Sequence, residues 1–101
     1  MNNTLFLPLK AKWYDMIESG EKTEEYREIK NYWADRLHST ALQDIAKGEF
    51  FKKFDTVTFS FGYTKRRMIF ECKGIVEGKG KPEWGAPEED VYIIKLGKRI
   101  R

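Results

Sequence analysis

Cysteine and histidine are nearly absent from this 101-residue sequence, which has one of each, Cys72 and His38. A single cysteine excludes an internal disulfide, and the two residues are too few for a metal site built from thiolates and imidazoles. No run reaches the roughly 18 apolar residues that a membrane span needs. No charged-then-apolar leader is visible either. We therefore expect a cytoplasmic protein with no membrane partner, no metal and no cofactor.

The composition predicts one domain, residues 1–101, with a single small core. Hydrophobic residues make up 41% of the chain and aromatic residues 15%. No internal repeat, low-complexity segment or long linker divides the sequence. The net charge of +3 is mildly basic and compatible with a polyanionic partner, although it does not identify one.

Periodicity predicts the elements of the first half. Leu5, Leu7 and Leu9 alternate with other residues as in a strand. Because Pro8 has no backbone donor, the strand either lies at an edge or leaves the ladder at this residue. A helix is expected over 11–19. Its core face should carry Trp13, Met16 and Ile17, and Tyr14 should lie on the opposite side.

Two short helices are expected next. One helical turn covers about 31–37. A second helix covers about 41–47, because Thr40 and Gln43 have the spacing of a capping box and Gly48 follows the last turn. His38 lies between them and is interpreted as a surface residue.

The second half has the period of strands. Segments 56–61 and 67–76 should pair antiparallel with Val57, Phe59 and Phe61 facing the core. In the longer strand, Met68, Phe70, Cys72 and Val76 share the apolar parity, and Gly74 should bend or bulge it. Residues 91–94 are apolar on both parities. This order predicts an α+β fold, a small and mostly antiparallel β-barrel of five to six strands with two or three helices covering its openings.

The most informative segment is Ser19-Gly20-Glu21-Lys22-Thr23-Glu24-Glu25-Tyr26-Arg27. Gly20 ends the predicted first helix, and a strand follows in which neither alternating face is apolar. Such a strand is either a solvated edge or one wall of a polar groove. We interpret it as a groove wall, since Lys22, Thr23, Glu25 and Arg27 would converge in a small volume.

The pattern Ser-Gly-x-Lys-Thr-x-Glu-x-Arg resembles the signature of ASCH domains, small barrels of the PUA-like superfamily. The resemblance extends over nearly the whole chain, from Leu7 to Ile100. It implies a PUA-like barrel whose motif lies at the mouth of a groove that takes nucleic acid. The superfamily contains both binding proteins and enzymes, so the resemblance predicts fold more specifically than function.

As a binding site, the segment predicts recognition of RNA or a nucleotide-like ligand. Arg27 offers a planar fork of donors for a phosphate or a base edge, and Lys22 offers a point charge. Tyr63 lies in a predicted turn beside three basic residues and is the preferred stacking residue. The complete predicted interface is Lys10, Lys22, Thr23, Glu25, Arg27, Tyr63, Lys65, Arg66 and Arg67.

Four alternatives remain open. Similarity to the ASCH amidohydrolases of acetylated cytidine implies catalysis by Lys22, but Glu25 occupies the position of their threonine. A ribonuclease could use Lys22 as electrostatic stabiliser and Glu25 as general base. A protein-interaction module would use the exposed aromatic residues instead. Glu25 and Arg27 could also be a purely structural pair. The oligomeric state is not predicted.

Overall fold

The computed structural model describes residues 3–101, which form an α+β fold. Along the chain, the elements are β1 (Thr4–Leu9), α1 (Ala11–Glu18), β2 (Glu24–Glu28), α2 (Asn31–Leu37), α3 (Leu42–Ala46), β3 (Thr56–Phe61), β4 (Arg67–Gly78), the 3₁₀ turn η1 (Pro82–Trp84) and β5 (Val91–Arg99). No helix among these residues is long and apolar enough to cross a membrane.

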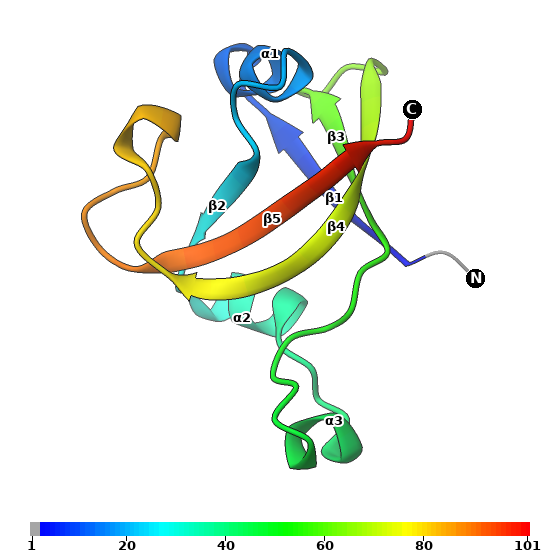
Figure 1. Cartoon of the computed structure of the whole chain (residues 1–101), viewed down its shortest axis with the longest axis vertical. Coiled ribbons are helices and arrows are strands. Elements are labelled where there is room, and N and C mark those ends of the chain that lie inside the picture. Colours follow the sequence, from blue (N-terminus) through cyan, green and yellow to red (C-terminus); the bar gives the residue numbers. More distant parts are fainter. Residues whose placement is uncertain (1–2) are drawn as a thin grey trace.

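The strands form one strongly curved sheet with the order β1-β3-β4-β5-β2, which curls into half a barrel (Figure 1). The predicted antiparallel pairing of β3 with β4 is confirmed, as is the edge position of β1. The sheet is nevertheless mixed, because β1 and β3 are parallel. The long crossover that contains α1, β2, α2 and α3 makes parallel pairing possible, and strand periodicity alone carries no information about direction.

The core lies on the concave face of the sheet. Leu5, Leu7 and Leu9 are buried, as their alternation predicts, and Val57 and Phe59 are completely buried. Phe61 is only half-buried, and its ring contacts the core from the end of β3. The four consecutive residues from Val91 to Ile94 are all buried. Tyr92 and Ile94 belong to the main core, whereas Val91 and Ile93 pack in a second cluster with Ala86 of the segment after β4.

A bulge in β4 changes which residues face the core. The register with β5 shifts on both sides of Cys72, and Gly74 has a φ of +131°. The prediction of a bend at Gly74 is therefore confirmed. The parity prediction fails beyond it, because the inserted residue exchanges the two faces. Ile75 is buried as a result, whereas Val76 is 41% exposed.

Helix α1 covers one end of the curled sheet (Figure 1). The predicted core face is confirmed at Ile17, which is buried. It was wrong for Tyr14, which is buried too, and Trp13 and Met16 are only half-buried. Tyr14 fits the core because its ring packs edge-to-face on Phe61, with 5.2 Å between the ring centroids.

Helices α2 and α3 lie toward the other end, and α3 projects beyond the body (Figure 1). Leu37 anchors α2 in the core. The predicted capping box at α3 is absent from the described residues, because the Ser39 hydroxyl accepts from the Ala41 N–H and donates to Asp44 instead. None of the residues of α3 is buried, and Leu42 is 82% exposed.

Candidate nucleic-acid groove

Lys22 is the most enclosed charged residue among the buried groups of the fold. Its side chain is 1% exposed, although it lies just after the turn that ends α1. The ammonium group donates to the Glu25 carboxylate at 2.7 Å and to the Trp84 carbonyl at 2.5 Å. It also lies 4.7 Å from the centre of the Trp13 ring and 5.0 Å from that of Tyr26. Lys22 is therefore a buried cation in a polar and aromatic enclosure.

Glu25 joins Lys22 to Arg27. One carboxylate oxygen accepts from Lys22, and the other accepts from Arg27 Nη1 at 2.6 Å. The same Nη1 also donates to the Tyr26 carbonyl at 2.6 Å. Because Glu25 is 5% exposed and Arg27 is 16% exposed, the chain of charges runs from the interior to the surface. Arg27 is thus the member of this chain of charges that a ligand can reach.

Burial and the two neighbouring charges act on the pKa of Lys22 in different directions. Burial lowers the pKa of Lys22 below its usual value, and the adjacent Glu25 carboxylate acts in the opposite direction. The nearby Arg27 charge adds to the lowering. Glu25 therefore offsets the repulsion between the positive charges of Lys22 and Arg27, because its carboxylate pairs with both.

Tyr26 and Lys22 attach the segment 79–90 to β2 and to the turn before it. The Lys81 N–H donates to the Tyr26 hydroxyl at 3.0 Å, and that hydroxyl donates to Glu24 at 2.8 Å. Burial raises the pKa of Tyr26 to about 12. Together with the bond from Lys22 to the Trp84 carbonyl, these contacts fix the position of the segment.

A groove opens between this segment, β2 and the start of α2. It has a volume of about 590 Å³, which is in the usual range for small-molecule sites. Its lining consists of Tyr26, Arg27, Glu28, Lys30, Trp33, Gly85, Pro87, Glu89 and Val91. We refer to this set as the Arg27 groove.

The Arg27 groove combines a planar cation, an aromatic ring and balanced charge. The Arg27 guanidinium lies 5.2 Å from the centre of the Trp33 ring, and its Nη1 is already fixed by Glu25. Lys30 pairs with Glu28 at 3.0 Å, and Glu89 adds a further carboxylate. With two cations and two carboxylates, the groove lining has no net charge. Such a site suits a base or nucleoside better than a bare phosphate.

The predicted interface separates into three groups. Lys22, Glu25 and Arg27 are brought together as predicted. Thr23 is exposed and its carbonyl accepts from the Leu96 N–H, while Lys10 is exposed at the start of α1. None of the four residues Tyr63, Lys65, Arg66 and Arg67 lines the Arg27 groove, because they belong to the turn between β3 and β4 and to the start of β4.

Arg66 has a local structural role among the residues of the β3–β4 turn. Its guanidinium forms an ion pair with Glu18 at 2.9 Å and lies over the rings of Tyr14 and Phe61. The hydrogen bond to Glu18 raises the pKa of Arg66, and the group is positively charged throughout the working range. Arg66 therefore connects α1 to the β3–β4 turn.

Several groove residues were not predicted as site residues. Trp33 lies in the predicted helical turn, Lys30 comes just before it, and Pro87 belongs to the irregular segment after β4. The contact between Arg27 and Trp33 could have been predicted only from the general tendency of guanidinium groups to stack on aromatic rings. Trp84 is partly buried and packs against a small cluster that contains Tyr26 and Val91.

Neither of the two scarce residues, His38 and Cys72, lines the Arg27 groove. His38 is half-buried, and its ring contacts the Phe50 carbonyl and the Tyr92 hydroxyl at 3.1 Å each. Burial raises the pKa of Cys72, so its thiol is less prone to ionise than an ordinary one. Within residues 3–101, no three His, Cys, Asp or Glu side chains are grouped as potential metal ligands.

Comparisons of the chain with protein-family models, with curated proteins and with solved structures find no match.

Proposed function

We propose that the protein binds RNA, with one unpaired base or a nucleotide-like fragment held in the Arg27 groove. The observation that carries this proposal is the guanidinium of Arg27, which is fixed by Glu25 and Tyr26 and lies against Trp33 at the groove wall. A fixed planar fork is suited to bidentate recognition of a base edge. An aromatic ring beside it supplies a stacking surface that every base can use.

We further propose that the fold is a PUA-like barrel of the ASCH type in a cytoplasmic protein. The curled five-stranded sheet is compatible with a small barrel. The segment from Ser19 to Arg27 supports the ASCH proposal, since it follows the end of α1 and forms β2 beside the groove. The parallel pairing of β1 with β3 is a departure from the mostly antiparallel barrel that we expected.

The experiment that tests RNA binding compares Arg27→Lys and Trp33→Ala with wild type in fluorescence anisotropy with a labelled single-stranded RNA. Arg27→Lys keeps a cation near Glu25 but removes the planar fork. We expect each variant to weaken binding by about 1–3 kcal/mol. Arg36→Ala is the control, since Arg36 is an exposed arginine of α2 outside the groove. Equal affinities for wild type and both groove variants would refute the proposal.

A hydrolase using Lys22 and Glu25 is the second candidate, and their direct contact at 2.7 Å favours it. Both Glu25 oxygens are already engaged by cations, however, and Lys22 is enclosed by the segment 79–90. Catalysis would therefore require displacement of that segment. If wild type cleaves acetylated cytidine or RNA and Lys22→Met does not, the protein is an enzyme rather than a binding protein.

A protein-interaction module is the third candidate. The apolar side chains of Leu42, Ile45 and Phe50, which are exposed on and near α3, favour it. Analytical ultracentrifugation of wild type and Leu42→Ser tests self-association through this surface, which the groove variants would leave unchanged.

A further inference from the structure

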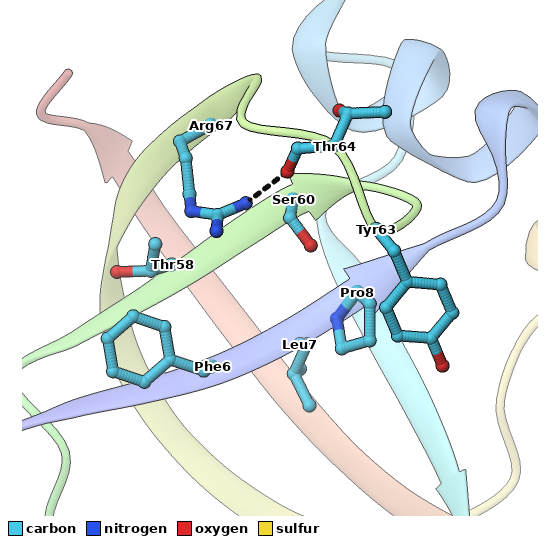
Figure 2. Close-up of a pocket in the computed structure, with 8 residues that line it drawn as sticks. All are labelled: Phe6, Leu7, Pro8, Thr58, Ser60, Tyr63, Thr64 and Arg67. Atoms are coloured by element: carbon cyan, nitrogen blue, oxygen red, sulfur yellow. Dashed lines mark hydrogen bonds between the residues drawn. The ribbon is translucent and has the colours of Figure 1, made fainter.

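A second, smaller pocket lies on the outer face of the sheet at the β1 edge (Figure 2). Its volume is about 270 Å³, and none of its residues belongs to the Arg27 groove. The lining consists of Phe6, Leu7, Pro8, Thr58, Ser60, Tyr63, Thr64 and Arg67. The sequence pointed to Tyr63 and Arg67 but not to the β1 and β3 residues beside them.

Strand register explains why these side chains meet. Phe6 pairs with Thr58 and Pro8 pairs with Ser60 across the parallel strands β1 and β3, so all four belong to the outward parity. Ser60 in turn pairs with Arg67 of β4. The face opposite the core therefore presents an apolar row on β1, a hydroxyl row on β3 and a cation at the start of β4.

Two large aromatic rings stand in solvent on this face. Phe6 is 66% exposed, and Tyr63 is 99% exposed in the β3–β4 turn. Figure 2 shows their rings on opposite sides of the pocket, with Pro8 near Tyr63 and the Arg67 side chain on the far side of Ser60. Exposed aromatic rings on a sheet face are the usual stacking platform for unpaired bases.

The charge of the pocket suits an anion. Arg67 Nη1 donates to the Thr64 carbonyl at 2.8 Å, which orients the guanidinium and leaves its other nitrogens available to a ligand. Lys65 lies exposed in the same turn. The lining contains Arg67 and no carboxylate, in contrast to the balanced charge of the Arg27 groove.

We infer that Phe6, Pro8, Tyr63 and Arg67 form an aromatic platform that binds one nucleotide of single-stranded RNA, with its base stacked on Phe6 or Tyr63 and its phosphate on Arg67. The inference takes its ligand class from the proposed function but uses a separate surface. The Arg27 groove reads a base edge, whereas the aromatic platform adds a second stacking surface and the phosphate contact that the groove lacks.

The test uses fluorescence anisotropy with a labelled oligouridylate of about twelve nucleotides, within the range that single-strand binding modules cover. Phe6→Ala and Tyr63→Ala should each weaken binding about 5- to 100-fold. Arg67→Ala should weaken binding and reduce the slope of log K against log salt by about 0.7. Phe50→Ala and Lys47→Ala are the controls, because they remove an exposed aromatic ring and an exposed charge elsewhere.

Arg27→Lys, measured in the same series, separates the two proposals. If only the platform variants weaken binding, the platform stands and the Arg27 groove is not the RNA site. If only Arg27→Lys weakens binding, the platform is refuted and the proposed function stands. Wild type that binds no oligouridylate refutes both. A proline-rich peptide that binds wild type and competes away the RNA would reassign the platform to protein recognition.

Discussion

The ammonium of Lys22 and the carboxylate of Glu25 lie 2.7 Å apart with side chains only 1% and 5% exposed. Their closeness has two consequences. Each charge is compatible with burial only because the other is present, and Arg27 is held at the surface by the second Glu25 oxygen. The buried pair thus supports the surface residue that we propose to contact RNA.

The first prediction concerns this pair. Glu25→Gln leaves Lys22 without a counterion and should destabilise the protein by about 3–5 kcal/mol. Lys22→Met should cost less, about 1–3 kcal/mol, because Glu25 retains Arg27 as a partner. Urea unfolding of both single variants and the double variant measures the coupling. The double variant should be more stable than the sum of the single effects implies, and strict additivity would contradict a coupled pair.

A second prediction contrasts two buried tyrosines. The Tyr26 hydroxyl makes hydrogen bonds to Glu24 and Lys81, whereas the buried Tyr14 hydroxyl has no partner within the described part of the chain. Tyr26→Phe should therefore lower the free energy of unfolding by about 1–3 kcal/mol. Tyr14→Phe removes an unpaired polar group and should leave stability unchanged or raise it by about 1 kcal/mol. Thermal melts of the two variants at neutral pH provide the comparison, and equal losses would show that the hydroxyls are equivalent.

The third prediction is the pH dependence that Tyr26 contributes. Its pKa is raised from 10.0 to about 12 in the folded state, chiefly by burial. The stabilisation is therefore complete below pH 10 and is lost as the pH rises through about 12. The loss of stability over this pH interval amounts to about 3 kcal/mol. Lys22 acts oppositely, because its lowered pKa makes stability rise with pH up to its ordinary value of 10.5.

Urea unfolding of wild type and Tyr26→Phe between pH 10 and pH 12 tests this assignment. The stability difference between them should shrink over this interval. Burial also raises the pKa of Tyr92, but that contribution is common to both proteins and cancels in the difference. A difference that stays constant across the interval would assign the alkaline loss to other groups.

Local sequence patterns predicted the parts of the fold that depend on alternation. Leu5, Leu7, Val57 and Phe59 show this, since a half-buried strand requires a period of two. The faces of α1 and of β4 beyond Gly74 were not predictable in this way. The first depends on which aromatic ring fits against Phe61, and the second depends on an inserted residue that reverses parity.

The candidate site also has a part that local sequence patterns predict and a part that they do not. The convergence of Lys22, Glu25 and Arg27 follows from their spacing around the end of α1 and along β2. The burial of Lys22 does not, because its enclosure is completed by Trp84, which is distant in sequence and belongs to an irregular segment. Strand pairing also brings Phe6 beside Thr58, and no local pattern encodes that contact.

A fourth prediction tests the bulge that sets the inward face of β4. Gly74 has a φ of +131°, a conformation that L side chains rarely adopt, although nothing lies within 4 Å of a Cβ added there. Gly74→Ala should therefore destabilise the protein by about 1–3 kcal/mol through backbone strain alone. Gly78→Ala is the matched control in the same strand, since its nearest contact is an ordinary 3.7 Å to Ile93. Urea unfolding should show a clear loss for the first and a small effect for the second. Equal losses would indicate that the effect is steric and unrelated to φ.

The fifth prediction concerns the salt dependence of the two proposed RNA surfaces. The Arg27 groove has balanced charge, so a free nucleoside bound there should show nearly the same affinity at low and physiological salt. An RNA strand that also reaches Arg67 should lose affinity with a slope near −0.7 per phosphate contact. Isothermal titration with cytidine and with an oligonucleotide at several salt concentrations measures both slopes.

Two variants assign those slopes to their surfaces. Arg67→Ala should flatten the oligonucleotide slope and leave cytidine binding unchanged, since Arg67 does not line the groove. Arg27→Lys conserves the charge and should weaken cytidine binding while changing the oligonucleotide slope little. Cytidine binding that falls steeply with salt would mean that unbalanced charge dominates the groove. In that case Arg27 would act as a phosphate contact, and the recognition of a base edge would have to be abandoned.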